Sequence, residues 1–393
     1  MIFKRISNSI HRKLVIVDEL LKYYLLYPLA AIYRKRDIWI IAERGMDARD
    51  NGFHLFRYIR ETDPSREVYY IISKKSPDRK HVEPYGNVVD YRSLKHYLLF
   101  IAAKVKISTH IMGFSPHRGF YSRMINRLRL PGKTVFLQHG VTQSDIRQLY
   151  AKRAKADLFI CGAKPEYEFI RAHYGYRKGV VRYTGFARYD HLHDLQTKKQ
   201  ILIMPTWRKS LARMAYSGKS IADTEFIRRW NSLLNNRTLL DAAEQAGVDI
   251  LFYPHYELQK FLGLFSSAGK NVTIADALHY DVQPLLKESA LLVTDYSSVH
   301  FDFAYMKKPC VYYQFDPDAF FTQQYRKGYF DFETMGFGEV TDSEDALCGI
   351  LIDYIRNGFA ENEKFKQRCA AFFPLHDKNN CRRIYEEILR LDP

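Results

Sequence analysis

Residues 291–316 read LLVTDYSSVHFDFAYMKKPCVYYQFD, and this stretch decides the fold class. The apolar run 291–294 predicts a buried strand, residues 299–306 predict a helix, and residues 310–313 predict a second strand. A strand, a helix and a strand in this order form a βαβ unit, whose two strands are parallel. The stretch therefore indicates a parallel sheet with helices on its faces.

The same alternation continues on both sides of this stretch. We predict further strands at 37–42, 68–73, 105–109, 134–138, 158–161, 200–204 and 250–253, and helices at 52–61, 93–103, 164–173, 223–246 and 282–288. This pattern predicts an α/β fold with two doubly wound, Rossmann-like domains facing a cleft. The predicted domains are 37–195 and 196–365. A segment 1–36 precedes them, and helices in 366–393 pack back. The chain has no GxGxxG or Walker loop, so nicotinamide and ATP chemistry lack support.

Composition excludes several classes of protein. The 393 residues contain five cysteines, an odd number without CxxC spacing, which argues against a disulfide scaffold or a structural zinc site. A reducing, cytoplasmic compartment is expected. Asp295, Asp302 and Asp316 do not form a recognised ligand set, so we predict no metal and no cofactor.

Charge is distributed unevenly along the chain. Residues 1–200 hold 38 Lys and Arg against 18 Asp and Glu, a net charge of +20, whereas residues 201–393 have a net charge of −4. An anionic partner is therefore expected on the first half. Because RNP-type motifs, recognition-helix signatures and zinc fingers are missing, we expect an anionic membrane surface and no nucleic acid.

Two segments have the character of membrane-surface helices. Residues 14–33 are mostly apolar and have basic neighbours on both sides, but Asp18, Glu19, Lys22 and Pro28 interrupt them. Charges at mid-bilayer are costly, so we expect this segment to lie on the cytoplasmic face of the membrane as a peripheral anchor. Residues 120–130 combine an apolar stripe with Arg123, Arg127 and Arg129. The alternatives are an ordinary first helix packed on its domain and a basic surface helix without a partner.

A candidate phosphate site follows the strand 291–294. Ser297 and Ser298 stand at the predicted first helical turn, where hydroxyl and free N–H groups favour an anion. Asp295 precedes them, and Asp302 lies one helical turn beyond Ser298 on the same side. The alternative is an ordinary helix cap, which needs only one such residue.

Several motifs together resemble one known family. They are FLQHGVT at 136–142, TGFARYD at 184–190, MPTWR at 204–208, YPH at 253–255 and the stretch 291–316. In this order they are similar to the signature of the CDP-glycerol glycerophosphotransferases, the teichoic-acid primases and polymerases. The resemblance implies a GT-B fold, an acceptor-side first domain and a second domain that binds a CDP-alcohol. After His139 and Gly140 the chain reads VTQSD where many polymerases carry TPLK, and no appended repeat follows. We therefore expect a primase-like or capsule-type enzyme.

The motif residues suggest individual roles. His139 follows a predicted strand and can accept a proton at neutral pH, while Gly140 allows close approach of a substrate. His255 would donate to the phosphates or the leaving group, and Arg208 offers a planar fork for pyrophosphate. The alternatives are hydrogen-bonded loop histidines and a surface arginine. We expect Arg188 and Asp190 to pair with each other at the hinge.

The leading functional hypothesis is transfer of a polyol phosphate from a CDP-alcohol to a lipid-linked saccharide or glycan acceptor, in teichoic acid or capsule-type polymer synthesis. A nucleotide-sugar glycosyltransferase of the same fold is the second hypothesis. A non-catalytic, membrane-bound module that only holds a glycan precursor is the third.

Overall fold

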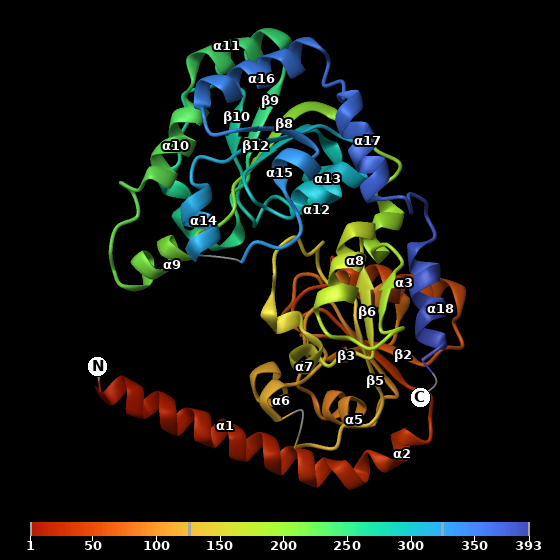
Figure 1. Cartoon of the computed structure of the whole chain (residues 1–393). Helices are drawn as coiled ribbons and strands as arrows, with labels where there is room; N and C mark the ends of the chain where they lie inside the picture. Colours follow the sequence, from red (N-terminus) through yellow and green to blue (C-terminus); the bar gives the residue numbers. More distant parts are fainter. Residues whose placement is uncertain (1, 125–126, 324–325, 392–393) are drawn as a thin grey trace. The chain divides into compact units, whose positions relative to one another are not determined.

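The computed structural model describes residues 2–124, 127–323 and 326–391 (Figure 1). The chain divides into two compact units. The first unit consists of Met1–His139, Arg147–Asp190 and Asp377–Pro393, and the second of Gly140–Ile146 and His191–His376. In each unit helices cover the faces of one parallel sheet, so the predicted α/β class with two Rossmann-like domains is confirmed.

The sheet of the first unit has seven strands in the order β3-β2-β1-β4-β5-β6-β7. They are β1 Trp39–Ala42, β2 Val68–Ile72, β3 Val88–Asp90, β4 Val105–Ser108, β5 Lys133–Phe136, β6 Leu158–Cys161 and β7 Val181–Tyr183. The strand order reverses between β1 and β4. In open parallel sheets ligands bind beyond the carboxyl ends of the strands at such a switch point.

The sheet of the second unit has six strands in the order β10-β9-β8-β11-β12-β13. They are β8 Lys198–Met204, β9 Asp249–Phe252, β10 Val272–Ile274, β11 Ser289–Thr294, β12 Cys310–Tyr313 and β13 Gly338–Thr341. Its switch point lies between β8 and β11, where Met204 is in register with Thr294. Trp230, fully buried, packs its ring against Tyr313 of β12 at a centroid distance of 5.5 Å.

The helices of the first unit are α1 Ile2–Leu29, α2 Ala31–Arg34, α3 Asn51–Thr62, α4 Arg79–Val82, α5 Leu94–Ala102, α6 Arg118–Met124, α7 Ala151–Ala154, α8 Lys164–His173 and α18 Asn380–Leu389. Those of the second unit are α9 Lys209–Tyr216, α10 Glu225–Leu234, α11 Arg237–Ala246, α12 Val282–Glu288, α13 Val299–Tyr305, α14 Pro317–Gln323, α15 Phe332–Met335, α16 Glu344–Arg356 and α17 Glu363–Phe372.

Two helix predictions were wrong in extent. The predicted helix 223–246 is two helices, because the side chain of Asn236 accepts a hydrogen bond from Leu239 N and begins α11. The predicted helix 120–130 is also shorter. Helix α6 reaches Met124, and residues 127–130 are not helical, while Ile125 lies outside the described residues.

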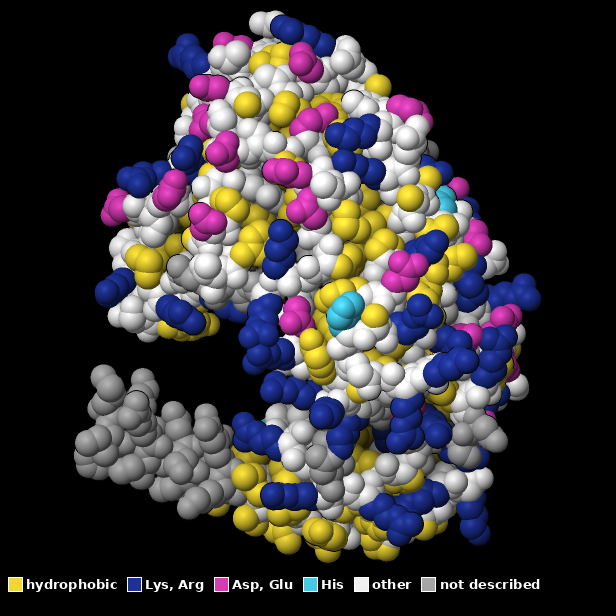
Figure 2. Space-filling model, viewed as in Figure 1, with side chains coloured by type: hydrophobic (Ala, Val, Ile, Leu, Met, Phe, Trp, Pro, Cys, Tyr) yellow, Lys and Arg dark blue, Asp and Glu magenta, His cyan; other side chains and the backbone are white. Residues whose placement is uncertain are grey.

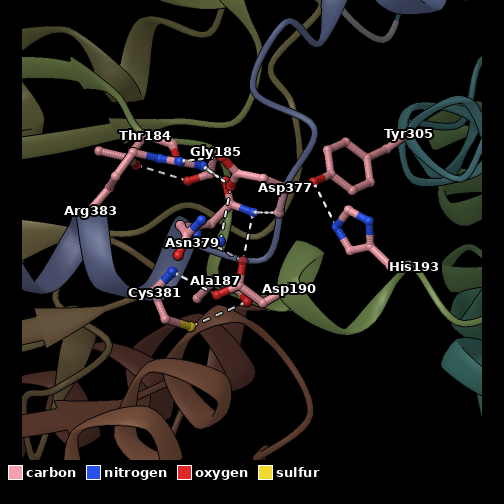
Figure 3. Close-up of polar contacts among 11 residues, drawn as sticks. Thr184, Gly185, Ala187, Asp190, His193, Tyr305, Asp377, Asn379, Cys381 and Arg383 are labelled. Atoms are coloured by element: carbon pink, nitrogen blue, oxygen red, sulfur yellow. Dashed lines mark hydrogen bonds and ion pairs between the residues drawn. The ribbon is translucent and has the colours of Figure 1, made fainter. Parts of the chain in front are cut away.

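The last helix, α18, belongs to the first unit, and Figure 3 shows how it is held there. The carboxylate of Asp190 accepts hydrogen bonds from Asn380 N and Cys381 N, both at 2.8 Å. Arg383 donates to the carbonyl of Thr184 at 2.9 Å. Gly185 has a φ of +77°, and a Cβ there would lie 1.9 Å from Asn380 Oδ1, so this close approach requires glycine.

Over residues 14–29, helix α1 packs one of its faces on α5. Tyr23 and Glu19 are buried, and Tyr97 of α5 donates to Glu19 Oε1 at 2.8 Å. The opposite face exposes a row of large apolar side chains: Leu14, Val17, Leu21, Tyr24, Leu25 and Leu29. Among the described residues no helix is both long and apolar enough to cross a bilayer.

Candidate functional site

In the first unit three loops converge on the switch point of the sheet. Glu43 follows β1, Thr109 and His110 follow β4, and His139 follows β5 by three residues. Gln138, directly before His139, has a φ of +57°, which turns the chain sharply as it leaves the strand. The sheet therefore gathers two histidines and a carboxyl group at the edge where a ligand is expected.

The rings of His110 and His139 are stacked. Their centroids lie 4.6 Å apart and their planes differ by 10°. Burial, and then the positive charge that His139 can carry, lower the pKa of His110 to about 2. Desolvation also lowers the pKa of His139, and the carboxylate of Asp50 opposes this effect. His139 nonetheless keeps an exposed surface, and its lowered pKa keeps the imidazole in the neutral form that accepts a proton.

A polar network supports the loop that carries His139. The Asn51 amide donates to the Gln138 carbonyl at 2.9 Å and accepts from Arg188 N at 3.1 Å. The guanidinium of Arg188 pairs with Asp50 Oδ1 at 2.9 Å. The expected pair between Arg188 and Asp190 is therefore wrong, because Arg188 turns to Asp50 and Asp190 holds α18.

Glu43 is the buried carboxyl group at the switch point of the first unit. It accepts backbone hydrogen bonds from Arg49, Asp50 and Phe53 at 2.9–3.2 Å, and so holds the start of α3 against the end of β1. Burial, reinforced by the nearby Asp50, raises the pKa of Glu43 to about 8. The group orders the loop between β1 and α3.

In the second unit the switch point is occupied by a buried ion network. Asp295, at the end of β11, forms an ion pair with Arg208 at 2.8 Å and accepts from Thr206 N at 2.9 Å. Arg208 also engages both oxygens of Asp316, at 2.8 and 2.9 Å. Its guanidinium, 6% exposed, is thus fully used in binding two carboxylates and the Thr206 carbonyl.

Aromatic rings enclose the Arg208 guanidinium. Tyr296 and Phe320 stack on each other at 3.9 Å, and the cation lies 5.0 Å from the centre of each ring. Such contacts add to the ion pairs and exclude water. Arg208 therefore holds the loops after β8, β11 and β12 together.

The serines next to this network are accessible. Ser298 occupies the cap position before α13, but its side chain makes no cap hydrogen bond, and the residue is exposed. Ser297 Oγ accepts only a long 3.5 Å bond from Val299 N. A Cβ on Gly140 would lie 3.4 Å from Ser298 Oγ, so the residue after His139 lies against this serine.

The loop Gly140–Ile146 belongs to the second unit and is anchored on residues 295–300, which we call the serine motif. Gln143 donates to the Tyr296 carbonyl at 2.6 Å, and His300 contacts Gln143 Oε1 at 3.1 Å. His300 is fully buried, also bonds Tyr312 OH at 2.8 Å, and has a pKa lowered to about 3 by burial. It serves as a fixed link between α13, β12 and this loop.

His255 and Asp302 are the remaining predicted residues. His255 begins the helical turn after β9, where its Nδ1 accepts from Glu257 N at 3.3 Å. Burial lowers its pKa, and the charges of Glu257 and Asp295 act in the opposite direction. Asp302 lies within α13 and is only 9% exposed. Within the described ranges no group of three or more His, Cys, Asp or Glu side chains is arranged to hold a metal ion.

Sequence reasoning did not identify His110, Asp50, Asn51, Gln143 or His300. Asp50 and Asn51 could have been noticed in the sequence, since Asp directly before a helix is a typical cap and Asn51 is the first residue of α3. His110 and His300 carried no such signal, because their partners come from other strands and loops.

Comparison with known proteins identifies a matching family and similar proteins. Residues 25–390 match the model of the family described as CDP-glycerol:poly(glycerophosphate) glycerophosphotransferase. The chain is 34% identical over 377 residues to the minor teichoic acid biosynthesis protein GgaB of Bacillus subtilis strain 168. That match covers 94% of the chain but only 41% of GgaB. A teichoic acid glycerol-phosphate transferase of Staphylococcus aureus is 30% identical over 199 residues, covering 49% of this chain and 46% of that protein.

The fold has a solved counterpart. A structure of the wall teichoic acid polymerase TagF, soaked with CDPG, superposes with a TM-score of 0.67 and covers 98% of both chains at 18% identity. The likeness shows that the two proteins share a fold.

Proposed function

Because the chain belongs to the CDP-glycerol:poly(glycerophosphate) glycerophosphotransferase family, we propose that it transfers a polyol phosphate from a CDP-alcohol to a glycan acceptor and releases CMP. The observation that carries this proposal is the presence, at the two switch points, of an accessible imidazole in one unit and accessible serines beside a buried carboxylate–arginine network in the other. GgaB and the S. aureus transferase, both named for teichoic acid, support this class of product.

His139 is the proposed general base. An acceptor hydroxyl must lose a proton as it attacks the phosphorus of the polyol phosphate, and the P–O bond to CMP breaks. A neutral imidazole accepts that proton. His110, which stays neutral beside it, holds the plane of the His139 ring through the stack. The Asp50 carboxylate stabilises the imidazolium that forms.

The serine motif is the proposed donor site. The Ser298 hydroxyl, which makes no cap bond, can donate to a phosphate oxygen of the CDP-alcohol. We assign Arg208 to positioning Asp295 and Asp316, since its fork is already occupied by their carboxylates. His255 would supply a proton or a hydrogen bond to the departing CMP.

His139 is joined directly to the loop that contacts the serine motif. His139 and Gly140 are consecutive, and Gly140 lies against Ser298. The proposed base therefore directly precedes the loop that lies against the serine motif.

Helix α1 is the proposed docking surface for an anionic bilayer. Its exposed apolar row is followed by Arg34, Lys35 and Arg36, and Tyr23 OH donates to the Arg129 carbonyl at 2.7 Å. This bond places the exposed segment that carries Arg127 and Arg129 beside the helix. Apolar side chains next to arginines suit the boundary between headgroups and acyl chains.

The net charges of the two units agree with docking of the first unit on an anionic bilayer. The first unit carries 40 Lys and Arg against 20 Asp and Glu, and the second 20 against 24. On the face shown in Figure 2, basic side chains dominate the first unit, whereas both signs mix on the second. A lipid-linked acceptor would thus meet the first unit at the cytoplasmic membrane face.

A thermal-shift comparison of nucleotides tests the donor class. We expect CDP and CDP-glycerol to raise the melting temperature of the second unit more than UDP or UDP-sugars at equal concentration. Stabilisation by UDP-sugars alone would favour the glycosyltransferase hypothesis. Binding of CDP-glycerol without any turnover would favour a non-catalytic module.

A further inference from the structure

The second unit contains a large cavity at the edge of its sheet opposite to the serine motif. It has a volume of about 690 Å³ and lies at the amino ends of β8, β11 and β12. Because β11 has six residues, the cavity lies about 20 Å from Asp295 along the strand. Five lysines line it, and we call it the lysine groove: Lys198, Lys199, Lys307, Lys308 and Lys366.

Lys308 builds the floor of the lysine groove. The residue is 6% exposed, and its ammonium donates to the carbonyls of Leu286, Lys287 and Ser289. These carbonyls end α12 and begin β11, so the amine satisfies backbone groups that would otherwise lack partners. Lys308 is therefore structural, and ligand binding must rely on the other lysines.

The rim of the lysine groove includes lysines that form no ion pair among the described residues. Lys198 pairs with Glu288, and Lys366 approaches Glu363 at 3.8 Å. Lys199 and Lys307 are exposed and have no ion pair among the residues that the structure describes. The half-buried Glu361 reduces the net positive charge of the groove but does not cancel it. Lys199 and Lys307 thus face the groove without an ion pair in the described part of the chain, and the positive charge of Lys307 acts on Glu361.

The backbone at Lys307 is a second sign of function. It has a φ of +55° directly after Met306, the C-cap of α13, a position where glycine is usual because other side chains are strained there. A lysine at such a position costs stability relative to glycine. Residues held in unfavourable backbone conformations gather at ligand sites.

We propose that the lysine groove binds the phosphodiester backbone of a poly(polyol phosphate) chain, and so holds product or acceptor away from the reacting end. This inference rests on the proposed function. The volume is in the range of ligand pockets and exceeds what a single phosphate needs. The spacing of the lysines suits a polymer that carries one negative charge per polyol-phosphate repeat. The rim has no exposed large apolar side chain, which argues against a bilayer as the occupant.

Fluorescence anisotropy with a labelled glycerol-phosphate decamer tests the proposal on the full chain. The variant Lys199→Ser/Lys307→Gly removes both unpaired charges, and glycine relieves the strained backbone, so it should fold at least as well as the parent. We expect its affinity to fall at least about tenfold, and the salt dependence of binding to weaken. The matched control is Lys219→Ser/Lys270→Ser, two exposed lysines of the same unit outside the groove. It should bind like the parent.

The outcomes separate this proposal from the proposed function, because the assay needs no CDP-alcohol and no turnover. Equal binding by parent and groove variant would overturn the proposal. Competition by inorganic phosphate at the same phosphate concentration would also overturn it, since the groove would then be a simple anion site. So would groove-dependent binding to vesicles of phosphatidylglycerol. Lysine-dependent decamer binding by a chain that releases no CMP would support the groove while the proposed function fails.

Discussion

At the residue scale, the contacts of Arg208 suit a residue that positions other side chains and not one that binds substrate directly. Its guanidinium binds Asp295 and both oxygens of Asp316 while almost completely buried. Removing it leaves the carboxylates of Asp295 and Asp316 without this cation, so Arg208→Ala should lower the free energy of unfolding by about 3–5 kcal/mol. Urea denaturation of the variant and the parent measures this. Unchanged stability with weaker CDP binding would instead indicate a direct contact with pyrophosphate.

His139 and Ser298 should separate chemistry from binding. His139→Ala should lower turnover at least about 100-fold with CDP binding nearly intact, as expected for loss of a general base. Ser298→Ala should weaken CDP-alcohol binding by about 1–3 kcal/mol, through a lost hydrogen bond to a charged group. Steady-state kinetics and calorimetric titration measure the two effects. The reverse pattern would show that the assigned roles are exchanged.

His300 gives a prediction about pH. Its folded-state pKa of about 3 lies below the unfolded value near 6.5, so its contribution to stability is complete above about pH 6.5 and is lost as the pH falls. Between pH 7.5 and 5 the loss is about 2 kcal/mol. His300→Gln cannot titrate, and its unfolding free energy should fall less over this interval. Comparison with the parent removes the opposing effect of groups such as Glu43, whose pKa is raised. Parallel pH dependences in parent and variant would contradict the buried neutral imidazole.

The motif residues were predictable one by one, but their partners were not. His139 and Asp295 could be placed at strand ends, since strand runs are visible in the sequence. The stack of His110 on His139 joins residues that follow β4 and β5, and the contact of Gly140 with Ser298 spans 158 positions. Such pairs depend on strand order, which periodicity does not contain.

At the scale of elements, the four strands that the sequence did not reveal are β3, β7, β10 and β13. These are the four edge strands of the two sheets. Each has only three or four residues, and at most one of them is buried. The interior strands consist mostly of buried residues, and most of these are apolar, because both faces of such strands are covered. Edge strands lack that cover and therefore that signal.

Helix α1 carries the element-scale prediction. Leu21 and Leu25 are 57% and 69% exposed, so Leu21→Glu/Leu25→Glu should leave the fold intact and reduce binding to phosphatidylglycerol vesicles at high salt, where the apolar contribution remains. Reversing Arg123, Arg127 and Arg129 to Glu should reduce binding mainly at low salt. Leu278→Glu, at a 92% exposed leucine of the second unit, is the control. Vesicle co-sedimentation measures all three. Unchanged binding by both α1 and arginine variants would exclude this docking surface.

At the scale of the whole molecule, two similar parallel sheets differ in their charge and loops, and the proposed function gives them different tasks. The first unit has a net charge of +20 and carries His139, the proposed base, whereas the second has a net charge of −4 and carries the serines and a buried ion network. The sequence predicted this division of charge and fold. It did not predict that residues 140–146 would join the second unit, since their anchors, Tyr296 and His300, lie far along the chain.

The central claim is tested most directly by CMP release from CDP-glycerol or CDP-ribitol. The purified chain is incubated with each CDP-alcohol, with and without a membrane lipid extract, and CMP is quantified together with transfer of labelled polyol phosphate to the lipid fraction. We predict acceptor-dependent CMP release with at least one CDP-alcohol, matched by equal transfer of label and abolished in His139→Ala. Absence of CMP release with both CDP-alcohols across several acceptors, from protein that is folded, would contradict the account.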